Sequence, residues 1–220
     1  TPGDFAKRLE QARTDGAEEA VIITISDKLS GTYDSACQTA EMVDMPVHVF
    51  DSRSTTMGLG FQVLAAARAR EAGGGAQEML AAAEAVRRHI NIIFTVDTLE
   101  YLHRGGRIGG AAKLLGTALQ LKPQLIISSQ SGMVEAGARV RTRTKALDTV
   151  FDTFTNTLNG QRNLHIAVMH IRAEEEARTL AARLQEEYHI DELLVTDTSP
   201  VLGVHAGPGP GGIVGYAGED

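Results

Sequence analysis

Two hydroxyl side chains flank a glycine in residues 26–33, Ser26-Asp27-Lys28-Leu29-Ser30-Gly31-Thr32-Tyr33, which lie between an expected strand and an expected helix. A Ser at the N-cap followed by Gly leaves backbone N–H groups and a hydroxyl at the positive end of a helix. Ser30, Gly31 and Thr32 therefore predict a site for a carboxylate or a phosphate. The alternative is that Ser30 only caps the helix.

A second candidate is Arg107, which lies between the pairs Gly105-Gly106 and Gly109-Gly110. Glycines let the backbone turn sharply, and the guanidinium of Arg107 then offers a planar fork of donors to an anion. A helix C-terminus with an exposed Arg107 explains the same residues.

His205 stands in a stretch rich in Gly and Pro, which favours a positioned hydrogen-bonding group. Gly207, Gly209 and Gly212 match the letters of a dinucleotide-binding loop. Prolines interrupt that match, however, and no helical pattern follows, so we reject this interpretation. The histidines show no metal-ligand spacing, and we expect no metal site.

Four cations crowd residues 139–145: Arg139, Arg141, Arg143 and Lys145. Arg139 and Arg141 are two residues apart on an expected strand and would share one face. The run is either a docking patch or a solvated edge strand, because edge strands often carry charges that block aggregation.

Composition excludes several classes of protein. The chain has 220 residues, 43% of them hydrophobic, and a net charge of -7, which argues against a nucleic-acid partner. Cys37 is the only cysteine, which fits a reducing compartment, and we expect a cytoplasmic protein. No apolar stretch is long enough for a transmembrane segment.

Val- and Ile-rich runs alternate with segments of helical period, which is typical of an α/β fold. The expected strands are residues 20–25, 47–50, 92–96, 125–128, 134–140, 165–169 and 193–196. Residues 124–140 resemble a hairpin that turns at Ser131-Gly132, which implies antiparallel pairing. We therefore expect two α/β lobes with helices packed on both: residues 1–90 with a mainly parallel sheet, and residues 91–220 with a mixed sheet.

Five motifs in order resemble the DegV family of fatty-acid-binding proteins. They are residues 26–33, Asp51-Ser52, residues 99–108 with Arg107, Leu121-Lys122-Pro123, and residues 203–209 with His205. Because the family's first strand and its Thr-Ser-Gln-Pro motif have no counterpart before Phe5, the chain resembles an N-terminally truncated member.

The resemblance implies a non-catalytic carrier that needs no cofactor and binds one long-chain fatty acid. Ser30, Gly31 and Thr32 would hold the carboxylate, and Arg107 and His205 would belong to the polar network near it. A fatty acid kinase would phosphorylate the bound ligand to an acyl phosphate for phospholipid synthesis, with the cations of Arg139, Arg141 and Arg143 as its docking surface.

The sequence also offers apolar lining for a tail. Candidates are Leu99, Leu102, Leu115 and Leu119, which recur through an expected helical segment, and Phe61; ordinary core packing explains each of them equally well. The alternative function is an acyl hydrolase with Ser30 as nucleophile and His205 as base, although Ser30 lacks the flanking glycines of a nucleophile elbow.

Overall fold

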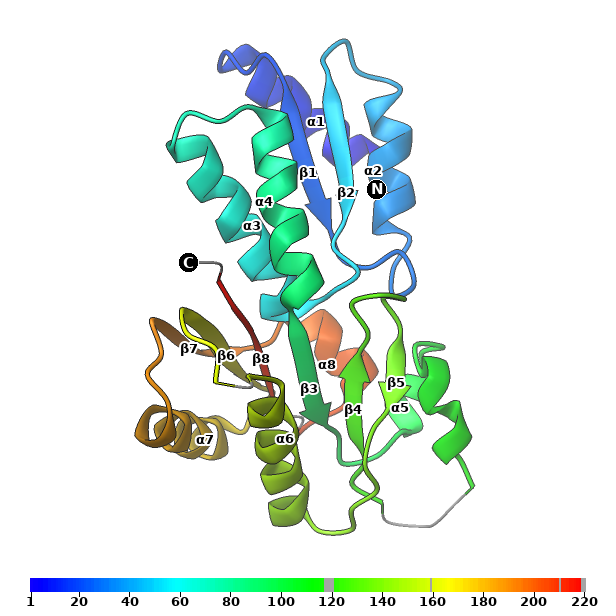
Figure 1. Cartoon of the computed structure of the whole chain (residues 1–220). Coiled ribbons are helices and arrows are strands. Elements are labelled where there is room, and N and C mark those ends of the chain that lie inside the picture. Colours follow the sequence, from blue (N-terminus) through cyan, green and yellow to red (C-terminus); the bar gives the residue numbers. More distant parts are fainter. Residues whose placement is uncertain (117–120, 159, 210, 219–220) are drawn as a thin grey trace. The chain divides into compact units, whose positions relative to one another are not determined.

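The computed structural model describes residues 1–116, 121–158, 160–209 and 211–218 and divides the chain into two compact units (Figure 1). Unit 1 comprises residues 1–55, 59–88 and 130–132. Unit 2 comprises residues 56–58, 89–129 and 133–220. Each unit has its own sheet, so we describe them separately.

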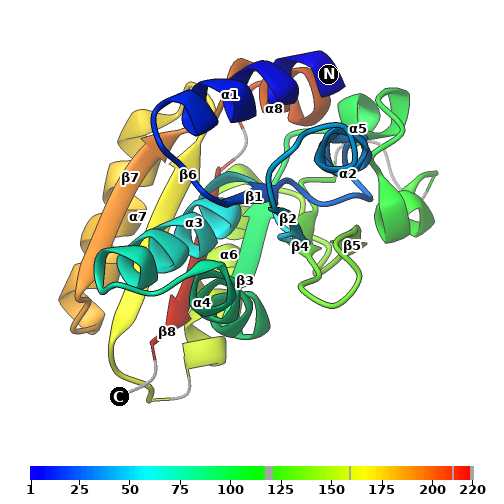
Figure 2. The same ribbon diagram turned by 90° about the horizontal axis from the view of Figure 1, so that it is seen from above.

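Unit 1 is built on two parallel strands, β1 (Ala20–Thr24) and β2 (Val47–Asp51), paired from Ala20–Val47 to Thr24–Asp51. Parallel neighbours need a crossover connection, and helix α2 (Thr32–Ala40) supplies it. Helices α3 (Thr56–Glu71) and α4 (Ala76–His89) lie on the opposite side of the strands from α2 (Figure 2). Helix α1 (Pro2–Thr14) packs against α2.

Unit 2 contains a six-stranded sheet with the order β5-β4-β3-β8-β6-β7. Only β6 and β7 run parallel to each other, and every other neighbouring pair is antiparallel. The strands are β3 (Asn91–Thr95), β4 (Gln124–Ile127), β5 (Val134–Ala136), β6 (Leu164–His170), β7 (Glu192–Asp197) and β8 (Gly211–Ala217). The predicted α/β class, with a parallel first sheet and a mixed second sheet, is thus confirmed.

Two long helices provide most of the core of unit 2. Helix α6 (Arg143–Leu158) packs on β3 and β8, and α7 (Glu174–Glu187) packs on β6 and β7. Their apolar faces bury Phe151, Phe154 and Leu184 almost completely. Three short helices complete the unit: α5 (Glu100–Arg104), the 3-10 helix η1 (Gly109–Leu114) and α8 (Pro200–Ala206).

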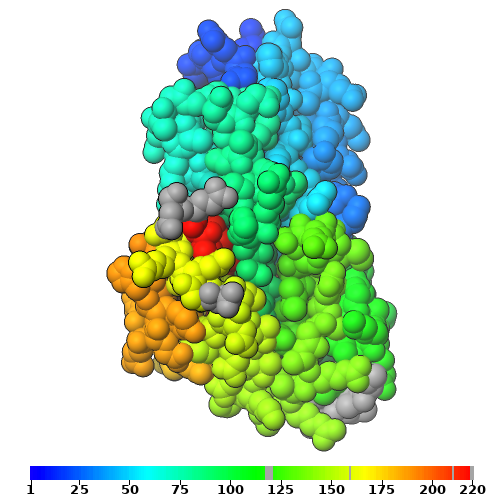
Figure 3. All heavy atoms as spheres, viewed as in Figure 1, coloured from blue at the N-terminus to red at the C-terminus, as the bar shows by residue number. Residues whose placement is uncertain are grey.

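The structure corrects the sequence prediction at β8, which we did not expect to be a strand. This Gly-rich segment lies between β3 and β6, and it reaches the surface in Figure 3 only as a small patch (red). A methyl group at Gly212 would lie 2.5 Å from Cβ of Phe94, and one at Gly215 would lie 2.7 Å from the carbonyl oxygen of His165. The glycines therefore let β8 fit between its neighbours.

The expected strand 134–140 is too long, because β5 ends at Ala136. The N–H of Gly137 donates to the carbonyl of Gln124 (2.9 Å), and the N–H of Gln124 donates to the carbonyl of Ala138 (3.0 Å). The side-chain oxygen of Gln124 also accepts the N–H of Ala138 (3.1 Å). Two residues therefore oppose one, as in a β-bulge, and the regular ladder stops there.

The expected helical segment around Leu99–Leu119 is also interrupted. Helix α5 ends at Arg104, and Gly106 has a φ of 69°, which is a left-handed conformation that ends a helix readily. The chain resumes as η1 at Gly109. Among the residues that the structure describes, no helix is both long and apolar enough to cross a membrane.

Candidate functional site

The strongest candidate site in unit 1 is the pair of hydroxyls at the start of α2. The Oγ of Ser30 and the Oγ1 of Thr32 lie 2.7 Å apart, and the backbone N–H of Thr32 donates to Ser30 Oγ at 3.3 Å. The helix N-cap is Gly31, one residue later than predicted, because the first helical residue is Thr32 and Gly31 has backbone angles (φ -68°, ψ 14°) outside the helical region. Ser30 still satisfies one free N–H of the first turn, and it does so from outside the helix.

The loop that carries these hydroxyls is anchored by Ser26, which follows β1 and is fully buried. Its Oγ donates to the carbonyl of Gly132 (2.8 Å) and accepts from the N–H of Lys28 (3.2 Å). The carbonyl of Ser26 accepts the N–H groups of Leu29 and Ser30. Any side chain at Gly132 would overlap Ser26 Oγ. Ser26 thus holds the loop in the conformation that presents Ser30.

Two carboxyl groups lie beside this loop, at the ends of the parallel strands. Asp51 Oδ1 accepts the N–H groups of Asp27 (3.3 Å) and Arg53 (2.9 Å), and burial raises the pKa of Asp51. The hydrogen bond from Lys28, 2.7 Å long, lowers the pKa of Asp27. Lys28 therefore partly offsets the negative charge of Asp27 near the hydroxyl pair.

In unit 2 the structure brings together the other two predicted head-group residues, Arg107 and His205. Arg107 donates from Nη1 to the carbonyl of Gly105 (2.7 Å), and its N–H donates to the carbonyl of Leu102 (2.9 Å). The ring of His205 lies against the same glycine, where any side chain would overlap its Nδ1. Within the described residues this buried Nδ1 makes no hydrogen bond.

His205 lies in the last turn of α8, a helix that the sequence prediction missed when it assigned a rigid Gly/Pro frame. Pro200 in the first turn and Gly207 just past the end are typical helix boundary signals. The sequence therefore carries a signal for this helix. Ser30, Gly31 and Thr32 belong to unit 1, whereas Arg107 and His205 belong to unit 2.

The predicted tail-lining residues have very different environments. Phe61 is fully buried in unit 1, and Leu102 on α5 is 4% exposed in unit 2. Leu99 is half-buried at the N-cap of α5, and Leu115 is 39% exposed after η1. Leu119 lies outside the described residues. Leu99 and Leu102 thus lie at the same helix, while Phe61 belongs to the other unit.

The basic run does not act as one exposed surface. Arg139 and Arg141 are exposed and flank the buried Val140, but they lie after the end of β5 and not on the expected strand. Arg143 instead starts α6 and donates to the carboxylate of Glu176, with its Nη2 at 2.6 Å. Arg143 is therefore already bound within unit 2.

Within the part of the chain that the structure describes, the Ser30 hydroxyl makes no hydrogen bond to a basic group that would activate it as a nucleophile. Among the described residues its hydrogen bonds are made with Thr32 only. Nucleophilic catalysis by Ser requires an adjacent general base within hydrogen-bond reach. The observed contacts are instead those of a hydroxyl that bonds to a neighbouring hydroxyl and to a backbone N–H at a helix start.

Comparison with known proteins gives consistent matches along the chain. The family model described as "Uncharacterised protein, DegV family" matches residues 1–217. A DegV domain-containing protein of Streptomyces coelicolor is 38% identical over 214 residues, which cover 97% of this chain and 75% of that protein.

Solved structures share the fold of both units. One, described as fatty acid binding of a DegV family protein from Thermus thermophilus, superposes with a TM-score of 0.91 at 34% identity and covers 99% of this chain and 77% of that one. Another, described as DegV, a fatty acid binding protein from Bacillus subtilis, has a TM-score of 0.88 at 28% identity with coverages of 99% and 77%.

Proposed function

Because this chain belongs to the DegV family, we propose that it binds one long-chain fatty acid and acts as a carrier without catalytic activity. The descriptions of the Thermus thermophilus and Bacillus subtilis proteins name fatty acid binding. The observation that carries the proposal to specific residues is the 2.7 Å hydroxyl pair of Ser30 and Thr32 at the start of α2.

The hydroxyl pair fits a carboxylate for two reasons. One hydroxyl donates to the other, and its hydrogen can rotate toward an anion in exchange for that bond, because a charge-assisted hydrogen bond is about twice as strong as a neutral one. The N-terminus of α2 adds backbone N–H groups and a favourable dipole for a negative charge. We propose Gly31, Arg107 and His205 as further polar contacts of the head group.

The tail supplies most of the affinity in this proposal. Burial of roughly fifteen methylenes at about 0.8 kcal/mol each gives on the order of 12 kcal/mol before the costs of association. A hydrogen bond to the charged head adds only about 1.5–3 kcal/mol. The head site therefore orients the ligand, while the apolar lining, for which we propose Phe61, Leu99, Leu102, Leu115 and Leu119, retains it.

We further propose that the carrier presents its ligand to a fatty acid kinase, which forms an acyl phosphate for phospholipid synthesis. The exposed Arg139 and Arg141 are the stronger candidates for the kinase-facing surface. The contribution of Arg143 would be smaller, because Glu176 already binds its guanidinium.

The first experiment is mass spectrometry of the natively purified protein, followed by titration with palmitate. We expect a stoichiometric free fatty acid or saturable uptake of palmitate. Absence of both would refute the carrier function.

The second experiment replaces the hydroxyls. Ser30→Ala and Thr32→Ala should each weaken palmitate binding roughly tenfold or more, since each removes about 1.5–3 kcal/mol of charge-assisted bonding. Thr14→Ala is the matched control, because it removes an exposed hydroxyl of unit 1 that donates to the backbone carbonyl of Glu10 and lies outside the proposed head-group site. If both Ser30→Ala and Thr32→Ala bound palmitate as tightly as Thr14→Ala, the head-group assignment would be wrong.

Labelling with a fluorophosphonate probe tests the hydrolase alternative. We expect no covalent adduct, because Thr32 rather than a base engages the Ser30 hydroxyl. Labelling that disappears in Ser30→Ala would replace the carrier proposal with an acyl hydrolase.

A further inference from the structure

Two segments of unit 2 interlock through three glycines. The segments are residues 97–105 and 205–209, and they run in opposite directions. Gly209 lies against Asp97, Gly207 against Tyr101, and His205 against Gly105. A methyl group at Gly209 would lie 2.7 Å from Oδ2 of Asp97, and one at Gly207 would lie 2.5 Å from Cδ2 of Tyr101. The side chains of Asp97 and Tyr101 thus occupy the space beside Gly209 and Gly207, and the ring of His205 occupies the space beside Gly105.

The glycines at 207 and 209 also have backbone conformations that other residues rarely adopt. Their φ angles are 79° and 84°. The N–H of Gly207 donates to the carbonyl of Gly203 (2.9 Å), and the N–H of Gly209 donates to the carbonyl of Ile171 (3.1 Å). The path of the chain after His205 is therefore set both by these bonds and by the contacts with Asp97 and Tyr101.

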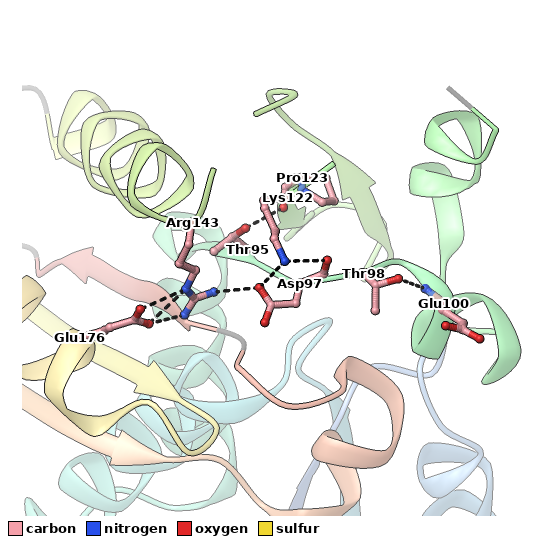
Figure 4. Close-up of polar contacts among 8 residues, drawn as sticks. All are labelled: Thr95, Asp97, Thr98, Glu100, Lys122, Pro123, Arg143 and Glu176. Carbon is pink, nitrogen blue, oxygen red and sulfur yellow. Dashed lines mark hydrogen bonds and ion pairs between the residues drawn. The ribbon is translucent and has the colours of Figure 1, made fainter. Parts of the chain in front are cut away.

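Asp97 is itself held in place by cations (Figure 4). Lys122 Nζ lies 3.0 Å from Asp97 Oδ1 and 3.3 Å from the backbone carbonyl of the same residue. Arg143 Nη1 lies 4.0 Å from Oδ1, and Glu176 binds the other nitrogens of the Arg143 guanidinium. With two cations on Oδ1, the other oxygen, Oδ2, faces Gly209.

We propose that Asp97 is a positioning residue for His205. Lys122 and Arg143 hold its carboxylate against Gly209, and this contact, together with Tyr101 on Gly207, keeps His205 on Gly105. The effect on ligand affinity rests on the proposed function, because it requires that His205 contacts the fatty acid head. The expected effect on the ring of His205 is independent of the proposed function.

The test uses Asp97→Asn, which keeps the size of the side chain but removes its charge. Glu100→Gln is the matched control, since Glu100 lies three residues after Asp97 and forms an exposed ion pair with Arg104. The ring nitrogen and carbon shifts of His205 are measured by NMR without ligand. We expect Asp97→Asn, and independently Lys122→Gln, to shift or broaden them, and Glu100→Gln to leave them unchanged.

Palmitate affinity gives the second measurement, in a double-mutant cycle with His205→Ala. Residues in one network show non-additive effects, so we expect Asp97→Asn to weaken binding by about fivefold in the wild-type background and to have no further effect in His205→Ala. Equal losses in both backgrounds would overturn the proposal, as would unchanged ring shifts in both Asp97→Asn and Lys122→Gln. If the wild-type protein bound no palmitate, the carrier function would fail, while the ring shifts would still decide whether Asp97 positions His205.

Discussion

Replacing Gly215 with Ala should destabilise unit 2 strongly, although it adds one methyl group. Gly215 lies in β8 and pairs with Asn91 on one side and Ile166 on the other. The new methyl would lie 2.7 Å from the carbonyl oxygen of His165, 2.9 Å from Cζ of Phe154 and 3.1 Å from Cγ1 of Ile166. The first of these atoms belongs to the backbone of the paired strand and cannot move without disturbing the sheet.

The size of the effect follows from these contacts. Overpacking of a buried site by a methylene costs about 1–3 kcal/mol, and in a chain of this size each kcal/mol lowers the melting temperature by about 2–4 °C. We expect a loss of about 2–12 °C for Gly215→Ala. Shortening the ring with Phe154→Leu should relieve part of the clash, so the double variant should lose less than the sum of the two single losses.

The measurement is thermal and urea unfolding followed by circular dichroism. Gly218→Ala is the control, because a methyl group there would make only ordinary contacts of 3.5 Å or more with Asn163 and His165. We expect the control to melt at or slightly above the wild-type temperature, since Ala restricts the unfolded chain. A melting temperature of Gly215→Ala equal to that of Gly218→Ala would refute the assignment of β8 as a tightly enclosed central strand.

Two further predictions concern charged groups. Burial raises the pKa of Asp51, so this group stabilises the fold at low pH, when it is protonated, and the contribution is lost as the pH rises through the raised pKa. In Asp51→Asn the side-chain oxygen can still accept the N–H groups of Asp27 and Arg53. This variant should therefore unfold at pH 7 at the same urea concentration as wild type or a higher one, and any gain in stability should disappear near pH 3. A large loss of stability at pH 7 would contradict this. Arg183→Met should lower the free energy of unfolding by about 0.5–1.5 kcal/mol, because the guanidinium carbon lies 3.6 Å from the centre of the Phe151 ring. The effect is modest because the guanidinium is partly exposed to solvent. An unchanged urea midpoint would contradict the prediction.

The strands rich in Val and Ile could be predicted from the sequence because their side chains are the signal. Residues 20–25 and 165–169 correspond closely to β1 and β6. Strand β8 could not be recognised in the same way, because Gly212 and Gly215 contribute no side chain to the pattern. These glycines matter because they leave space for side chains and backbone of the neighbouring strands. Those strands are distant in the sequence, so no local pattern reveals the requirement.

In the candidate site, too, some features could be predicted from the sequence and others depended on the folded backbone. The hydroxyl motif was visible in the sequence, but the N-cap shifted from Ser30 to Gly31, since a cap depends on the local backbone angles. The bulge at Gln124 likewise ended β5 early, because its side chain bonds to Ala138. Nothing in the spacing of residues 137–141 indicated that contact.

The sequence by itself determined the α/β class, the hydroxyl segment at Ser30 and Thr32, and the family to which the chain belongs. These are properties of side-chain type and short-range order. Only the tertiary structure decided that β8 is central and that Asp97, Tyr101 and Gly105 interlock with residues 205–209. The physical reason is that a glycine carries no side chain of its own, so its role depends on which distant groups fill the space beside it.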